Sequence, residues 1–357
     1  MNWQKCDHII YNTIAGSNLY GTNTPLSDID IRGVFVPIKE VILGVDNIEQ
    51  IESADSDTVY YSISKFFKLA LNGNPNIIEL LFAPIDTPRY AGTELLVCTD
   101  TWKKIIDNRN MFLSTKVKHT FVGYAFNQIK RIRNHRNWLL SPPKKQPERS
   151  DFGLPTEKCL MPKDQIYAFD KIIALYLETI CDHHELREQL EKEILDHTDF
   201  TAISQSLRGK IPTETLTQLT GLPMNFIEYI AKENSYLKAL KEYNSYEKWK
   251  IERNKERAVL EAKCGFDAKH ASHVYRLLKE GRELLLTGKI TFPRPEAEVL
   301  LDIKNGNWKY EQIEELFDGV DSEFTKYEEQ SVLPHFPDHN KTNSILLEIL
   351  VQFIEKK

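Results

Sequence analysis

The stretch GSNLYGTNTPLSDIDIRG, residues 16–33, places two aspartates two positions apart behind a loop rich in Gly, Ser, Thr, Asn and Pro. If the end of the stretch is a strand, Asp28 and Asp30 point to the same face, because side chains alternate along a strand. Like charges so placed repel unless a positive group lies between them. Paired carboxylates behind a Gly-Ser turn therefore predict a site for a divalent cation that is shared with a triphosphate.

The residues around this pair suggest further roles. Gly16 allows the backbone to approach a phosphate closely, and the Ser17 hydroxyl can hydrogen-bond phosphate oxygens. A third carboxylate is needed to activate an attacking hydroxyl, and a neighbouring strand should supply it. Asp57 is the predicted residue and Asp55 the alternative, because strand starts are uncertain by a residue or two. If the two aspartates are instead turn and cap residues, one acid is explained but not its partner.

The organisation of the 357-residue chain changes near residue 110. Before it, β-rich runs alternate with helical runs, and after it nearly every segment has helical periodicity. We predict an α+β fold, with a small mixed-sheet domain over residues 1–110 and a larger all-helical domain over residues 111–357. Long helices are expected at residues 115–140, 162–197, 225–244, 246 to a break near Gly265, and 267–287, with a shorter one at 295–305.

Composition limits the class of protein. The start MNWQKCDHII has no signal-peptide pattern, and no apolar run reaches the length of a membrane span. Five scattered cysteines form no CxxC pair, which argues against a disulfide framework or a zinc site. We therefore predict a cytoplasmic protein with no membrane partner.

The net charge of −6 conceals a basic zone, residues 116–149, with nine Lys or Arg against one acid. A phosphate-bearing partner is one interpretation of this zone, and a solvated helix face is the other. Tyr124, Gln128, Arg131 and His135 fall on one stripe of the expected helix, and an aromatic group among cations suits single-stranded nucleic acid. The residues predicted to bind such a partner are Tyr124, Gln128, Arg131, Arg133, Lys145 and Arg149.

A second stripe lies on the expected helix 267–287. Lys269, His273, Arg276 and Glu280 follow one another at spacings of four, three and four residues, so they share one face. Lys269 and Arg276 are suited to neutralising phosphate oxygens, and His273 to contacting a base. The alternative is a solvated face with an ordinary charge pair.

These motifs together resemble a known family. GSNLYGTNTPLSDID resembles the GS…DxD signature of the DNA polymerase beta nucleotidyltransferases. With IRGVFVP, KFFKLALNGNPNIIELLF and DAKHASHVYRLLKEGRELLLTGKI, the chain is similar to the RNA-ligase-associated, RNA-repair-pathway branch. The resemblance implies transfer of a nucleoside monophosphate from a nucleoside triphosphate to an acceptor, with loss of pyrophosphate and dependence on Mg²⁺ or Mn²⁺. Carried over, it makes Gly16 and Ser17 the nucleotide-holding turn and Asp28, Asp30 and Asp57 the metal ligands.

The acceptor is less well defined by the sequence. The leading interpretation is an RNA end, tRNA included, because of the family's association with RNA ligases and because of the basic zone. The alternative is nucleotidylation of a protein or a small molecule. A nucleotide sensor with an inactive site is a third class, which the intact DxD motif disfavours.

Overall fold

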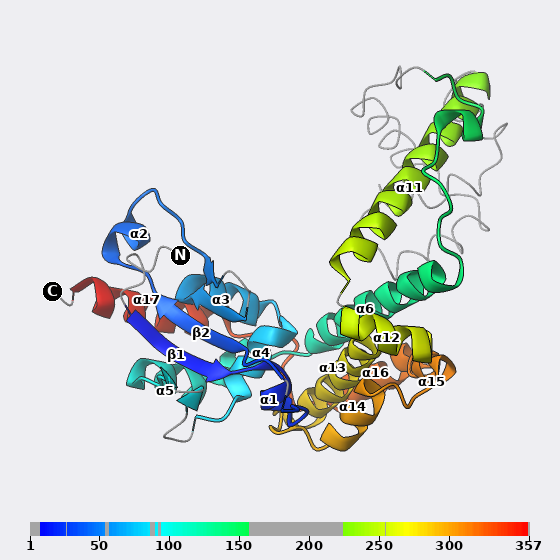
Figure 1. Cartoon of the computed structure of the whole chain (residues 1–357). Coiled ribbons are helices and arrows are strands. Elements are labelled where there is room, and N and C mark those ends of the chain that lie inside the picture. The colour runs from blue at the N-terminus through cyan, green and yellow to red at the C-terminus, as the bar shows by residue number, and fades with distance from the viewer. Residues whose placement is uncertain are drawn as a thin grey trace. The chain divides into compact units, whose positions relative to one another are not determined.

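The computed structural model describes residues 8–25, 27–53, 57–85, 90–91, 94–156, 224–253 and 255–355. Packing divides the chain into two compact units, drawn in Figure 1. The first unit joins Met1–Leu140 to Asn254–Lys357, and the second is Ser141–Arg253.

A four-stranded sheet lies in the first unit. Its strands are β1 (His8–Ile14), β2 (Ile31–Val36), β3 (Gln50–Glu52) and β4 (Thr58–Ser62), in the order β1-β2-β4-β3. β2 pairs antiparallel with β1 and parallel with β4, and β3 pairs antiparallel with β4, so the sheet is mixed as predicted. A separate two-stranded sheet is formed by β5 (Tyr90–Ala91) and β6 (Glu94–Leu95).

The register of the sheet brings three chain segments to one edge. Ile14 at the end of β1 pairs with Ile31 at the start of β2, and Ile31 pairs with Thr58 at the start of β4. The short helix α1 (Gly16–Tyr20) follows β1 directly. The segments before β2 and before β4 therefore meet beside the beginning of α1.

Helices with apolar faces pack around the sheet. They are α2 (Lys39–Leu43), α3 (Ile63–Leu71), α4 (Pro75–Phe82), α5 (Asp100–Asp107) and the 3-10 helix Arg109–Phe112. Ser62 caps α3 by accepting the Lys65 amide at 3.3 Å, and Pro75 occupies the first turn of α4, where its missing amide hydrogen costs nothing. The ring of Tyr11 in β1 stacks on Trp102 of α5 at 4.2 Å, so the core lies between the sheet and these helices.

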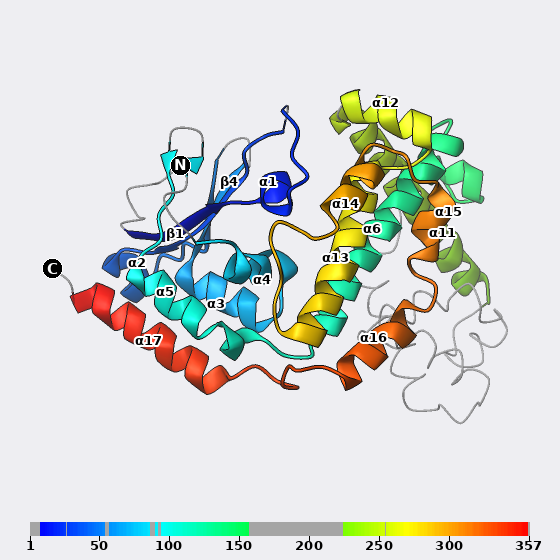
Figure 2. The same cartoon turned by 90° about the horizontal axis from the view of Figure 1, so that it is seen from below.

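The C-terminal helix α17 (His339–Glu355) belongs to the same packing. It contacts α3 and the 3-10 helix Arg109–Phe112, and Figure 2 shows it running along the N-terminal helices. The end of the chain thus completes the packing around the N-terminal sheet.

The remaining helices of the first unit are organised on an antiparallel pair, α6 (Val117–Leu140) and α13 (Ala268–Thr287). Phe121 near the start of α6 approaches Gly281 near the end of α13, whereas the Arg136 side chain reaches the Gly265 carbonyl, just before α13 begins. Asp267 caps α13, and Gly288 ends it in the left-handed conformation. The other helices are α12 (Lys255–Cys264), α14 (Ala297–Lys304), α15 (Tyr310–Glu315) and α16 (Val320–Glu329).

The second unit contains the long helix α11 (Met224–Glu252) and the 3-10 helix Arg149–Phe152. They are joined by Arg149, whose guanidinium contacts Glu233 at 2.6 Å and the Tyr229 hydroxyl at 3.2 Å. The Phe152 and Tyr236 rings pack edge to face.

The predicted α+β class is confirmed, as are the helices near 115–140, 267–287 and 295–305. The helices expected at 225–244 and from 246 form a single helix up to Glu252, because no Pro or Gly interrupts the sequence there. The helix expected at 162–197 lies outside the described residues. The division into a mixed-sheet domain over residues 1–110 and a helical domain over residues 111–357 stays a prediction. Within the described ranges, no helix has both the length and the apolar character needed to cross a bilayer.

Candidate functional site

The predicted site residues Gly16, Asp28 and Asp30 meet at the edge of the sheet. The Ala15 amide donates to the Asp30 carbonyl at 2.8 Å, and the Asn18 side-chain amide donates to the Asp28 carbonyl at 3.1 Å. These bonds tie the loop that carries both aspartates to the helix that begins at Gly16.

Gly16 itself lies against the Asp30 carboxylate. Its φ of +61° is in the left-handed region, and a Cβ atom there would overlap Oδ2 of Asp30 and lie 3.0 Å from Cγ. The positive φ favours a glycine here, and any larger residue would require the Asp30 carboxylate to shift. The carboxylate therefore faces the turn that the sequence predicts to hold a phosphate.

The strand predicted to carry the two aspartates begins only after both of them. Both precede β2, which starts at Ile31, and the loop before them is turned by a bond from the Thr24 amide to the Ser27 hydroxyl at 2.8 Å. Asp28 is exposed and Asp30 is half-buried. Strict alternation along a strand therefore does not fix the direction of the two side chains.

Asp57 lies beside Asp30, one residue before the paired starts of β2 and β4. Its carbonyl accepts the Ile31 amide at 2.8 Å, which extends the parallel pairing by one position. Adjacent strands are about 4.8 Å apart, so Asp30 and Asp57 are neighbours across the sheet edge. The alternative, Asp55, lies outside the described residues.

Arg32 places a positive charge beside Asp30, one of the two aspartates. Its guanidinium donates to the carbonyl of Asp57 at 2.7 Å and to that of Ile31 at 2.9 Å, and it lies 3.5 Å from the Asp30 carboxylate. The sequence DIDIRG shows that Arg32 follows the two acids closely, but it does not indicate the bond from Arg32 to the Asp57 carbonyl.

The donor set fits one kind of metal site. Asp28, Asp30 and Asp57 offer hard oxygen atoms, yet in the described part of the chain no group of three His, Cys, Asp or Glu is arranged to hold a metal ion. Magnesium is commonly bound through one or two carboxylates together with substrate phosphates. The residues present therefore fit a cation shared with a triphosphate and not one enclosed by protein alone.

The residues predicted on α13 occupy different environments. Lys269 is exposed, His273 is partly buried, and Arg276 is buried at 5% exposure. One guanidinium nitrogen of Arg276 binds Glu79 of α4 and lies 3.2 Å from Glu280, and the other lies 3.3 Å from Nδ1 of His273. The stripe thus turns inward at Arg276, where sequence reasoning expected a phosphate-facing surface.

Electrostatics agree with this burial. Burial alone would lower the pKa of Arg276, but the carboxylates of Glu280 and Glu79 raise it above its ordinary value, so the guanidinium stays charged. Burial raises the pKa of Glu280 and lowers the pKa of His273. His273 is therefore a neutral imidazole near pH 7, able to form hydrogen bonds but not to supply positive charge. Sequence reasoning missed Glu79 as the partner of Arg276, although an acid inside the apolar run NIIELL was a signal.

Many cations of the basic zone, residues 116–149, are engaged by acids. Arg133 binds Glu314 with two nitrogens, at 3.0 and 2.5 Å, and Lys118 binds Glu328 at 2.9 Å. In the second unit, Lys145 binds Asp151 at 2.7 Å and Arg149 binds Glu233.

The remaining members of the zone are more accessible. Tyr124 is 37% exposed and its hydroxyl accepts the Asn74 side-chain amide at 2.7 Å, while Gln128 is half-buried. Among the described residues, the exposed cations Lys130, Arg131 and Lys144 have no carboxylate partner. The zone is therefore much less positive than its sequence indicates.

The N-terminal part of the chain thus has a mixed sheet, a Gly-Ser turn directly after its first strand, and aspartates before two parallel strands. Residues 1–142 match the model of the RNA repair pathway DNA polymerase beta family, RlaP. The resemblance seen in the sequence is thereby confirmed for this part of the chain.

A relative supports similarity along most of the chain. An "uncharacterized 38.9 kDa protein in nrdC-mobD intergenic region" of Enterobacteria phage T4 is 25% identical over 329 residues, with 87% of each chain aligned. No solved structure matches the chain.

Proposed function

We propose that the protein transfers a nucleoside monophosphate from a nucleoside triphosphate to an acceptor hydroxyl. The observation that carries this proposal is the sheet edge where the Asp30 carboxylate lies against Gly16 and where the backbone of Asp57 pairs with that of Ile31, the residue after Asp30. The match of residues 1–142 to a polymerase beta family supports it.

In this proposal the turn at Gly16 and Ser17 holds the triphosphate, because a backbone without a side chain and a hydroxyl donor suit phosphate oxygens. Asp28 and Asp30, with Asp57, would hold Mg²⁺ or Mn²⁺. When bound, such a cation offsets the charge of the phosphates and favours attack at the α-phosphorus.

Asp57 accepts the proton of the acceptor hydroxyl as that oxygen bonds to the α-phosphorus. The bond from the α-phosphorus to the bridging oxygen breaks, and pyrophosphate leaves with its electron pair. Arg32 supports this arrangement by holding the Asp57 carbonyl, which keeps that residue beside Asp30.

The test is transfer of label from each of the four α-labelled nucleoside triphosphates in the presence of magnesium or manganese. Asp30→Asn retains the shape of the side chain but removes its charge, so transfer should fall below detection while the thermal unfolding midpoint is nearly unchanged. Asp107→Asn, at an exposed aspartate ending α5, is the matched control and should retain full activity. Full activity of Asp30→Asn would refute the proposed site.

An RNA end is the acceptor that we propose first, because the description of the matched family names an RNA repair pathway. Binding of RNA to cations releases counterions, so affinity should fall with salt. Lys130→Gln combined with Arg131→Gln should reduce the log-log salt slope for a short single-stranded RNA by about one to two units. Lys145→Gln, whose ammonium is already paired with Asp151, is the control and should change the slope much less.

The ion pairs of the basic zone favour a second candidate, a protein or small-molecule acceptor. Cations engaged by Glu314, Asp151 and Glu233 contribute little to counterion release unless RNA displaces those acids. A salt-independent, weak RNA affinity together with labelling of protein bands that survives ribonuclease treatment would select this candidate.

A further inference from the structure

The helix that begins with Gly16 and Ser17 has only five residues. A single turn of helix is not stable by itself in water, because the conformational entropy lost in forming the first turn exceeds the free energy gained from its hydrogen bonds. The position of α1 therefore depends on contacts at its two sides. Toward the sheet edge, these are the bonds from Ala15 and Asn18 to the backbone of the aspartate loop.

On its other side, α1 is held through Tyr20, which is buried at 9% exposure. The Tyr20 hydroxyl donates to Oε2 of Glu79 at 2.7 Å, and the Arg276 guanidinium lies over the ring, 4.0 Å from its centroid. Glu79 uses its other oxygen to bind Arg276, which also contacts Glu280. Three helices, α1, α4 and α13, thus meet at one buried set of charges.

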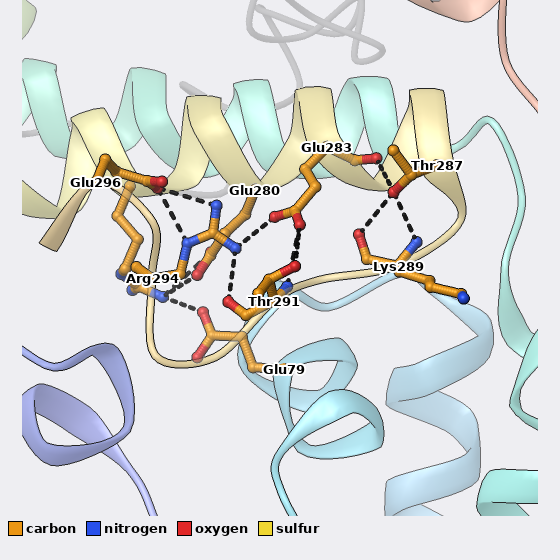
Figure 3. A network of polar contacts seen from close by, with 9 residues as sticks. Glu79, Glu280, Glu283, Thr287, Lys289, Thr291, Arg294 and Glu296 are labelled. Atoms are coloured by element: carbon orange, nitrogen blue, oxygen red, sulfur yellow. Dashed lines mark hydrogen bonds and ion pairs between the residues drawn. The ribbon is translucent and has the colours of Figure 1, made fainter.

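The segment between α13 and α14 adds to this attachment. The Arg294 amide donates to the Tyr20 carbonyl at 3.1 Å, and a Cβ atom on Gly21 would lie 2.9 Å from Cβ of Pro293. Arg294 is itself fixed by Glu283 at 2.5 Å and Glu296 at 2.9 Å, as Figure 3 shows, close to Glu280 and Glu79. The end of α1 is therefore held by Arg294, which is itself held by two ion pairs.

We propose that Tyr20 is a positioning residue, which fixes α1 through Glu79 and Arg276 and so sets the place of Gly16 and Ser17 relative to Asp30. This inference rests on the proposed function, in which that turn holds the triphosphate. Tyr20 does not touch the substrate. Arg276 then acts through Tyr20, in place of the direct phosphate contact that its sequence position predicted.

The energetics favour a role in geometry over one in stability alone. A buried ion pair often contributes no more to stability than apolar side chains of the same size, because its charges lose their hydration. Hydrogen bonds between buried polar groups are directional, however, so few positions of α1 satisfy the second oxygen of Glu79. The network therefore selects one placement of the Gly-Ser turn.

The variant Tyr20→Phe removes the hydroxyl and keeps the ring. Its matched control is Tyr310→Phe, because the Tyr310 hydroxyl also binds a glutamate, Glu314, that is paired with an arginine, and the Arg136 guanidinium lies 4.2 Å from its ring centroid. Tyr310 lies on α15 and has no contact with α1 among those described. The two variants remove the same chemical contact at different places.

Hydrogen exchange followed by mass spectrometry is the first readout, since it does not require activity. Exchange over residues 16–22 should be about tenfold faster in Tyr20→Phe than in the unmodified protein and unchanged in Tyr310→Phe. The second readout is nucleotide transfer: kcat should fall about tenfold or more in Tyr20→Phe alone, because small displacements of a substrate-holding group reduce rate strongly. Tyr20→Phe should also lose more thermal stability than Tyr310→Phe, because Tyr20 and Glu79 are buried whereas Tyr310 is partly exposed.

The outcomes separate the inference from the proposed function. Unchanged exchange over residues 16–22 in Tyr20→Phe would overturn the inference whatever the activity. Faster exchange with unchanged kcat would also overturn it, because the placement of α1 would then not matter to catalysis. If the unmodified protein transfers no nucleotide at all, the proposed function fails, and the exchange result still decides whether Tyr20 fixes α1.

Discussion

Replacing Gly16 by alanine has two effects, one on the backbone at Gly16 and one on the position of the Asp30 carboxylate. We expect the first to lower stability and the second to lower the rate of transfer. An alanine at φ +61° costs about 1–2 kcal/mol, because its Cβ approaches the carbonyl oxygen in the left-handed region. The new Cβ would also overlap Oδ2 of Asp30, and this carboxylate must rotate or shift to make room. Because the overlapping atom ends a flexible side chain, we expect the shift to add little to the loss of stability.

The effect on activity should be much larger. A displacement of about 1 Å at a reacting centre lowers rate about 100-fold. Gly319→Ala is the matched control, because Gly319 has φ +76° and no atom within 4 Å of the position of a Cβ. It carries the backbone cost without any overlap.

The assay combines urea unfolding with the rate of nucleotide transfer at saturating triphosphate. Both variants should lose about 1–2 kcal/mol of stability, and Gly16→Ala alone should lose about 100-fold in rate. If Gly16→Ala transfers nucleotide as fast as Gly319→Ala, the carboxylate beside Gly16 is not part of the reaction, and the reasoning from this contact is wrong.

Two further predictions concern buried charges. Arg276→Met should lower the free energy of unfolding by about 3–5 kcal/mol, measured in urea, because it leaves carboxylates buried without a counter-charge; a loss below 1 kcal/mol would contradict the network. Burial alone would raise the pKa of Asp267, but the bond with His270 lowers this pKa below its ordinary value of 3.8. The Asp267 charge therefore stabilises the fold above pH 3.8, and this stabilisation is lost as pH falls through the lowered pKa. Asp267→Asn preserves the cap acceptor, and its stability deficit at pH 7 should shrink below pH 3.8; a deficit independent of pH would exclude a role for the charge.

Local patterns in the sequence were sufficient to predict the mixed sheet and the long helices α6, α11 and α13, but not α15, α16 or α17. Strands and helices follow from periodicity over neighbouring residues, and GSNLYGTNTPLSDIDIRG indicated the turn and the acids that the structure brings together. Where the strand begins was less certain, because the turn between Thr24 and Ser27 keeps the aspartates outside β2.

Features that depend on distant partners were not predictable from local patterns. The stripe through Lys269, His273 and Arg276 has the spacing of a polar surface, but Arg276 is buried because Glu79 and Tyr20, about 200 and 250 residues away in sequence, provide its partners. The ion pairs within the basic zone have the same cause in part, since Arg133 is paired with Glu314, which lies far along the chain. No periodicity within one helix reports such pairs.

The packing of the first unit limits when its core can fold during synthesis and where the chain can be truncated. The segment that matches the family model ends at residue 142, yet the guanidinium that neutralises Glu79 comes from α13, and α17 completes the packing around α3. During synthesis on a ribosome, we expect the core around the N-terminal sheet to close only after α13 and α17, in the last quarter of the chain, have been made. A fragment cut at residue 142 would leave the buried Glu79 carboxylate without Arg276 and expose the apolar face of α6. Activity measurements should therefore use the whole chain, and a nonsense mutation even late in the gene should abolish the function of the N-terminal site.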